Sequence, residues 1–215
     1  MKFGIKLIVV TVLFITLALS GCQKTYYAVW EKMGKEKRHL LKDEVEDARI
    51  DQQEASEQFQ STLEKIKQIY GFEGGELEKF YKNLSSDYEE CEERAATVSD
   101  RVEKVERIAS DLFQEWEQEI GMITNTRMQA QSKAALKDTQ KRYTRLHQSM
   151  VKAEVSMKPV LKNLNDYVLY MKHNLNARAI GALKREVGSI ETEVESLITD
   201  MNRSIKEAER FLKDF

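Results

Sequence analysis

The sequence has little of what interrupts a helix. It contains one proline and nine glycines among 215 residues, and only 8% of its residues are aromatic. Proline and glycine are the residues that least favour a helix interior. Their scarcity, together with 33% charged residues, is typical of long helices and argues against a sheet protein.

Positive charge is also not in excess. The formal net charge is −2 for the whole chain and −4 without residues 1–21, because that segment carries two lysines and no acid. Domains that bind nucleic acid usually carry a basic excess. We therefore expect no nucleic-acid partner.

Motifs of common catalytic and metal sites are missing from the sequence. No glycine belongs to a G-x-x-x-x-G-K-S/T phosphate loop, so no ATPase is indicated. His39, His147 and His173 lie far apart and form no metal-binding pair. No serine or threonine has a neighbouring acid-base pair for nucleophilic catalysis. We expect a non-enzymatic protein without a cofactor or a metal site.

The first 22 residues have the pattern of an export signal. Lys2 and Lys6 precede a nearly unbroken apolar run, residues 7–19. This run is too short to span a membrane, which takes about 20 residues. The run ends in Leu19-Ser20-Gly21-Cys22, which resembles the bacterial lipobox. The resemblance implies cleavage between Gly21 and Cys22, diacylglycerol on the Cys22 thiol and acylation of the new amino group. The alternative is an ordinary secretory signal with a chance cysteine.

Lipidation predicts the location of the protein. Three acyl chains hold a protein stably at a membrane, whereas one holds it only marginally. Gln23 stands where an aspartate would favour retention in the inner membrane of a Gram-negative cell. We expect an outer-membrane lipoprotein facing the periplasm, with residues 1–21 as signal peptide and residues 22–215 as a helical bundle domain.

Apolar residues recur at alternating spacings of four and three over most of the mature chain, which is the pattern of coiled-coil helices. The strongest stripe consists of Leu77, Tyr81, Leu84, Tyr88, Cys91, Ala95, Val98, Val102, Val105, Ala109, Leu112 and Trp116. Similar stripes run from Leu41 to Tyr70, from Leu136 to Leu175 and from Ile180 to Phe211. The fold class predicted is all-α, with four long helices.

Three breaks separate the stripes. The segment "GFEGG", residues 71–75, supplies glycines for a turn. The segment "GMITNTRMQAQS", residues 121–132, predicts a loose polar link in which Gly121 caps the preceding helix. The segment "KHNLNA", residues 172–177, is the weakest break, because asparagine disfavours a helix without forbidding it.

These elements predict an elongated antiparallel bundle, since helices of roughly 40 to 47 residues are about 60 to 70 Å long and the links are short. The alternative is three helices with the last one continuous through residues 172–177. Pro159 lies inside the third stripe, where we expect it to kink the helix.

Two surfaces are candidates for binding. A membrane-proximal foot would combine Tyr26, Tyr27 and Trp30 with Lys35 and Arg38, because aromatic rings and cations favour the headgroup region. The alternative is the solvated start of the first helix.

A partner-binding tip would form where the first and third breaks meet. It would present Phe72, His173, Asn174, Asn176 and Arg178. The alternative is that the asparagines only cap helix ends.

Cys91 lies among Glu89, Glu90, Glu92 and Glu93, which would suit a soft-metal or redox site. It also falls on the stripe, while most of the glutamates point elsewhere. We interpret it as a buried small apolar residue without a disulfide partner in the chain.

The mature chain resembles a family of uncharacterised proteobacterial lipoproteins, classed as a domain of unknown function. The stretches that carry the resemblance are "YYAVWEKMGKEKR", "FEGGELEKFY", "LFQEWEQE", "MKPVL" and "KHNLNARAIGAL". The resemblance implies no catalytic residue. Some members are loosely labelled DNA-repair ATPases, which conflicts with the missing phosphate loop and the export signal.

The sequence thus favours a lipid-anchored envelope scaffold or adaptor, with the membrane and an unknown envelope protein as partners. The alternative function is a binding module that holds an apolar or lipid ligand between its helices.

Overall fold

The computed structural model describes residues 36–71 and 77–215, and for residues 177–179 only the backbone. It contains the helices α3 (Lys37–Lys67), α4 (Leu77–Met122), α5 (Thr126–His173) and α6 (Ala177–Asp214), and one 3-10 turn, η1 (Gln68–Gly71). No strand occurs in these described ranges. The prediction of four long helices in an all-α bundle is confirmed.

The chain divides into two units, residues Met1–Leu41 and Lys42–Phe215. Of the first unit the structure describes only the start of α3, where Arg38 lies in the first turn. The predicted boundary after Gly21 falls outside the described residues. The bundle described below is that of residues 42–215.

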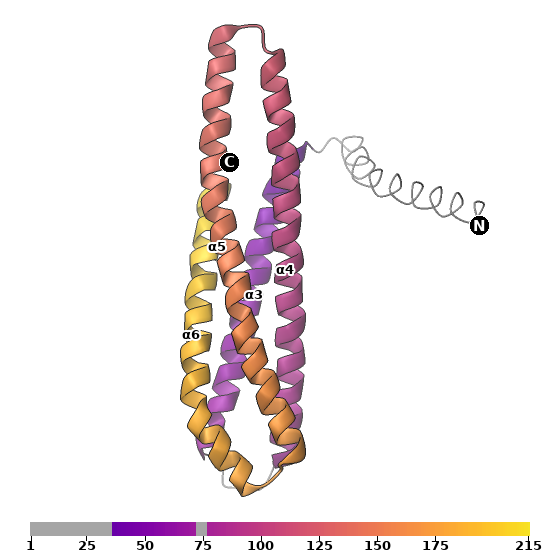
Figure 1. Ribbon diagram of the computed structural model, residues 1–215, viewed down its shortest axis with the longest axis vertical. Helices are drawn as coiled ribbons and strands as arrows, with labels where there is room; N and C mark the ends of the chain where they lie inside the picture. Colours follow the sequence, from indigo (N-terminus) through magenta and orange to yellow (C-terminus); the bar gives the residue numbers. More distant parts are fainter. Residues whose placement is uncertain (1–35, 72–76) are drawn as a thin grey trace, which may run out of the picture. The chain divides into compact units, whose positions relative to one another are not determined.

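Hydrogen bonds and ion pairs between helices give the order α3, α4, α5, α6 around the bundle. Arg101 of α4 contacts Asp51 of α3, and Ser99 of α4 donates a hydrogen bond to Glu154 of α5. Further pairs join α5 to α6 through Lys152 and Asp200, and α6 to α3 through Glu191 and Lys67. Sequential helices run antiparallel (Figure 1).

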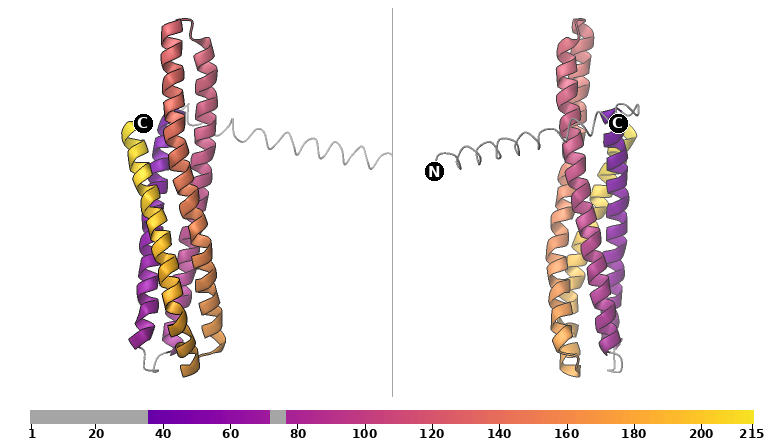
Figure 2. Two further views of the ribbon diagram at one scale, coloured as in Figure 1. Left: turned by 60° about the vertical axis from the view of Figure 1, so that its left-hand side comes forward. Right: turned by 90° about the vertical axis from the view of Figure 1, so that its right-hand side faces the viewer.

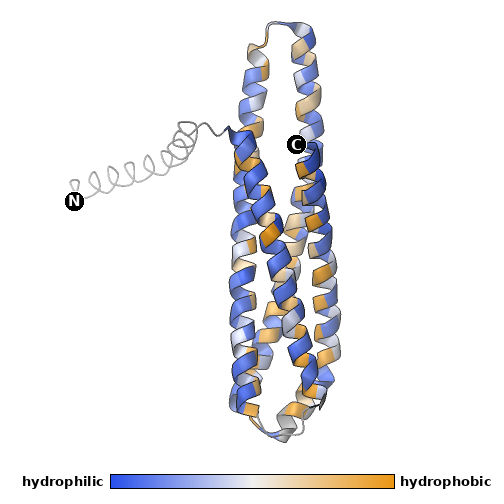
Figure 3. Ribbon diagram, turned by 180° about the vertical axis from the view of Figure 1, so that it is seen from behind, coloured by the Kyte–Doolittle hydropathy of each residue, from blue (hydrophilic) through white to orange (hydrophobic). Residues whose placement is uncertain are grey.

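The predicted stripes form the core. On α4, the buried positions run from Leu84 through Cys91, Val98 and Val105 to Leu112 at the predicted spacing. Figure 3 shows hydrophilic and hydrophobic residues alternating along the helices, as such a stripe requires. Each buried aliphatic side chain contributes about 1.5–3 kcal/mol.

The predicted loose link at residues 121–132 is wrong. Gly121 lies inside α4, only residues 123–125 are non-helical, and α5 begins at Thr126. The Asn125 side chain accepts hydrogen bonds from the N–H groups of Arg127 and Met128, both at 3.1 Å. The residues after this N-cap include arginine, methionine, glutamine and alanine, which are good helix formers despite their mostly polar character.

The weakest predicted break is real, so the alternative with one continuous last helix is wrong. Helix α5 ends at His173, and α6 begins at Ala177. The N–H of Asn174 donates to the carbonyl of Met171 at 3.1 Å and closes α5. Pro159 lies within α5, which continues beyond it to His173.

Among the described residues of 42–215, one end of the bundle consists of α4 and α5 alone. Arg142 of α5 donates a hydrogen bond to the carbonyl of Asp214, the last residue of α6, at 2.7 Å. The part of α5 before Arg142 therefore runs on beyond α6, for about 24 Å, together with the end of α4 (Figure 2). An aromatic cluster of Phe113, Tyr143 and Phe211 lies where this two-helix extension begins.

Replacing Val102 with Asp tests the core. Val102 is buried, and a carboxylate placed there would lack a partner, so we expect a loss of about 3 kcal/mol or more. For a chain of this size the melting temperature would fall by about 6 to 12 °C. Val155→Asp is the matched control, because Val155 is 52% exposed. Equal melting temperatures for both variants in a circular dichroism melt would contradict the core assignment.

Candidate partner-binding tip

The 3-10 turn η1, which follows α3, and the turn between α5 and α6 lie at the same end of the bundle, as predicted (Figure 1). The Nζ of Lys184, on α6, donates to the carbonyl of Tyr70, in η1, at 3.1 Å. About two turns further along α6, Glu191 Oε1 lies 2.7 Å from the Nζ of Lys67. Two contacts between positions far apart in the sequence therefore fix this shared end, which we call the tip.

The structure describes some of the predicted tip residues in full and others only in part or not at all. Phe72 lies outside the described residues, and of Arg178 only the backbone is described. His173 is the exposed last residue of α5. Asn174 and Asn176 lie in the short turn between α5 and α6.

Asn174 uses its polar groups locally. Its Nδ2 donates to the carbonyl of Tyr170 at 2.9 Å, and its own carbonyl accepts from the N–H of Asn176 at 2.8 Å. The carbonyl of Asn176 in turn accepts from Ile180 at the start of α6. These contacts match the alternative in which the asparagines cap helix ends.

Four exposed apolar side chains near the tip were not among the predicted site residues. Tyr70 is 54% exposed, Leu169 49%, Tyr170 38% and Leu175 42%. Single exposed apolar residues are ordinary, but several at one end of a rod mark a candidate contact surface.

The sequence analysis placed Tyr70 and Leu175 at the ends of two apolar stripes, but both side chains are exposed. The chain tightens from an α-helix into η1 after Lys67, and a 3-10 turn has three residues per turn. This change of phase buries Ile69 and turns Tyr70 outward. Leu175 follows the end of α5, so the helical period no longer applies to it.

Beneath the tip lies a small apolar cavity. It has an empty volume of about 230 Å³, including the solvent at its mouth, and is lined by Ile66, Ile69, Phe80, Leu84, Tyr167, Leu183, Val187 and Ile190. Burial raises the pKa of Tyr167 to about 12. Only about 10 Å³ of this space is open to a water-sized molecule, about the room that one water needs, so the packing here is close to complete.

Cys91 is fully buried between α3 and α4. Its sulfur lies 3.4 Å from the Thr62 hydroxyl, and burial raises its thiol pKa to about 11. A thiol with this pKa is protonated at neutral pH and is a poor nucleophile. No group of three or more His, Cys, Asp or Glu in the described part of the chain is arranged to hold a metal ion.

The predicted foot and anchor lie mostly outside the described residues. This applies to Gly21 and Cys22, and to Tyr26, Tyr27, Trp30 and Lys35 of the foot. Within residues 36–71 and 77–215, no helix has the length and hydropathy to cross a membrane.

Comparison with known proteins identifies a family but no function. No curated protein and no solved structure matches the chain. The family described as "Protein of unknown function (DUF2959)" matches residues 26–215, which include all four helices and the tip. The chain therefore belongs to the DUF2959 family of proteins of unknown function.

Proposed function

We propose that this protein is a lipid-anchored outer-membrane lipoprotein, facing the periplasm, that acts as a non-enzymatic scaffold or adaptor. The observation that carries the adaptor role is the set of exposed apolar side chains at the tip, Tyr70, Leu169, Tyr170 and Leu175. The anchor is supported by the Leu19-Ser20-Gly21-Cys22 sequence.

The shape of the bundle separates its two ends. Helices α4 and α5 have 46 and 48 residues, which corresponds to about 70 Å. Lys42, where this unit begins, is separated from the tip by most of the length of α3. A chain attached upstream of Lys42 would thus present the tip away from its point of attachment.

Many charged side chains in this bundle serve as contacts between helices. Arg101 joins three carboxylates of α3, Glu44, Asp47 and Asp51, and Asp87 pairs with Lys65 at 2.6 Å. Such pairs connect neighbouring helices and account for these charges without a substrate. They support a structural role.

The alternative, a ligand held between the helices, would need a larger interior space. Among the described residues, the apolar cavity below the tip leaves only about 10 Å³ open to a water-sized molecule, about enough for one water molecule. Native mass spectra of the purified chain would reveal a bound lipid. A stoichiometric lipid would favour this alternative over the adaptor.

Cys22→Ser tests the anchor. The hydroxyl cannot form the thioether, so the precursor should accumulate unprocessed and unlabelled by a radioactive fatty acid. Gln23→Asp should instead leave processing intact and shift the protein toward the inner-membrane fraction. Normal processing and membrane fractionation of the Cys22→Ser variant would contradict lipidation, and unchanged sorting of Gln23→Asp would argue against the outer membrane.

Photo-cross-linking tests the tip. A benzophenone amino acid in place of Tyr70 or Tyr170 should give a discrete adduct with an envelope protein in cells. The same probe at Ile50, which is 40% exposed on α3, is the control and should give none. Equal adducts at all three positions, or none at the tip, would count against the adaptor role.

A further inference from the structure

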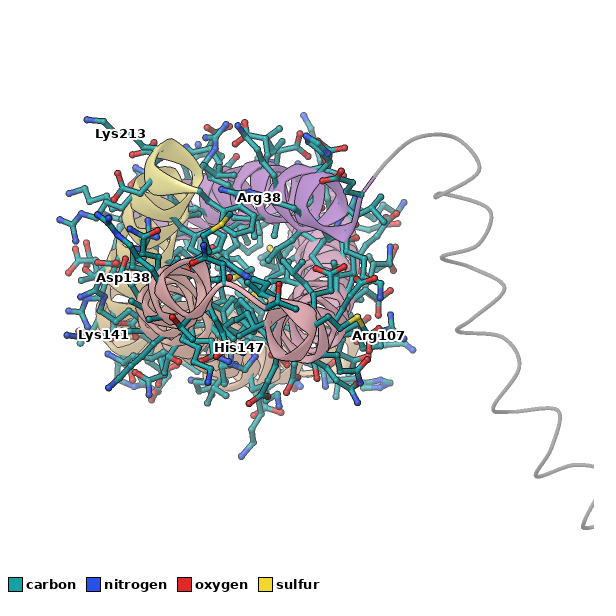
Figure 4. The ribbon with its side chains drawn as sticks, turned by 90° about the horizontal axis from the view of Figure 1, so that it is seen from above. Arg38, Arg107, Asp138, Lys141, His147 and Lys213 are labelled. Carbon is teal, nitrogen blue, oxygen red and sulfur yellow. The ribbon has the colours of Figure 1, made fainter. Side chains whose placement is uncertain are left out.

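A row of lysines runs along the outward face of α5. We call Lys133, Lys137, Lys141, Lys158 and Lys162 the lysine stripe; all five are exposed. They project from the face of α5 opposite its buried residues, such as Leu146 and Met150. Figure 4, seen along the bundle, shows Lys141 pointing away from the core. From Lys133 to Lys162 the stripe covers about 44 Å.

Charge is distributed unequally between neighbouring helices. Helix α5 has ten lysines and arginines against three carboxylates, whereas α4 has thirteen carboxylates against six basic residues. The net charges are therefore +7 on α5 and −7 on α4. The basic excess belongs to one helix of a chain whose overall net charge is only −2.

The described part of the chain provides few carboxylates on the face of the lysine stripe, of which the exposed Asp166, four residues after Lys162, is one. None of its five lysines has a hydrogen bond or ion pair there. Nearby cations that do have partners lie off the stripe: Lys152 lies 2.7 Å from Asp200, and Arg142 lies 3.1 Å from Asp138. Asp138, the carboxylate closest in sequence to Lys137, is thus already paired.

The stability of α5 does not account for this arrangement. Lys133, Lys137 and Lys141 are spaced four residues apart, where like charges destabilise a helix. Helix α5 also has no acid in its first turn, although an acid there would favour its macrodipole. An external anionic surface would attract these lysines and offset the repulsion between them.

The residue types indicate which kind of anionic surface. All five members of the stripe are lysines, and lysine is depleted in protein interfaces whereas arginine is enriched. Lysines on flexible stems are typical of segments that bind anionic lipid headgroups. Val155, 52% exposed, lies between Lys141 and Lys158 on the same face and would contact the interfacial region.

We propose that the lysine stripe docks α5 along its length on a membrane surface that carries anionic phospholipids. The stripe lies on one continuous helix, α5, so its lysines follow one another along the same side of the bundle. This contact is separate from the lipid proposed for Cys22 and does not depend on it.

Vesicle flotation of the full chain tests the proposal. The probes are vesicles of phosphatidylcholine alone and vesicles in which phosphatidylglycerol replaces part of it. We expect tighter binding to the anionic vesicles in about 0.01 M salt, and loss of that preference in about 1 M salt, where charges are screened over about 3 Å. Each lysine near the surface is worth about fivefold in affinity.

Matched double variants localise the contact. Lys137→Glu with Lys141→Glu should weaken binding to anionic vesicles at least about 25-fold. Lys206→Glu with Lys213→Glu makes the same charge change at exposed positions of α6 and should leave binding within about twofold. If the glutamates unfold the chain in a circular dichroism melt, Lys137→Gln with Lys141→Gln replaces them and should still give about 25-fold.

Three outcomes would overturn the proposal. One is no preference for anionic vesicles at low salt. Another is an equal loss in the stripe and control variants, which would indicate a response to net charge only. The third is stripe-dependent binding to polyglutamate without binding to vesicles, which would assign the stripe to an acidic protein. The Cys22→Ser variant separates this contact from the anchor, since it should keep the preference for anionic vesicles.

Discussion

The apolar stripe on each helix of residues 42–215 leaves water only by packing against the stripes of its neighbours. Val98, Val105, Leu164 and Leu197 are all at most 1% exposed. Because apolar residues recur at spacings of four and three, the burial of one position dictates which face of the helix turns inward over its whole length. The order of the helices, the antiparallel turns and the outward placement of charge depend on this constraint.

Burial alone does not fix how far one helix slides along another, because a shift by seven residues would return apolar side chains to similar places. Polar contacts remove this ambiguity. Arg101 contacts Glu44, Asp47 and Asp51, and Asp200 accepts from both Lys152 and Ser156. Gln52 and Ser204 occupy buried positions, and a polar residue in such a position is a known determinant of register in coiled coils.

Sequence reasoning predicted the four helices well because the stripe signal is long and repeats many times. It failed where a local effect competes with the period. The polar composition of residues 126–132 concealed a helix start that Asn125 caps, and the tightening of η1 turned Tyr70 outward. It could not predict the pairing of Asp87 with Lys65, since such a contact depends on the distance between two helices. The lysines of α5 were visible in the sequence, but their common outward face required the placement of its buried side.

The two-helix extension has a thermodynamic consequence. Past the level of Arg142 and Asp214, α4 and α5 have each other but no α6, so a residue there buries less surface than one in the four-helix section. Local opening free energies follow such differences in contact density. Amide protons near the turn at residues 123–125 should thus exchange with solvent through brief separation of this helix pair. Amide protons around Val98 and Leu164 should exchange only when the whole bundle unfolds. The two parts of the continuous helix α5, before and after Tyr143, would in this way unfold in separate steps.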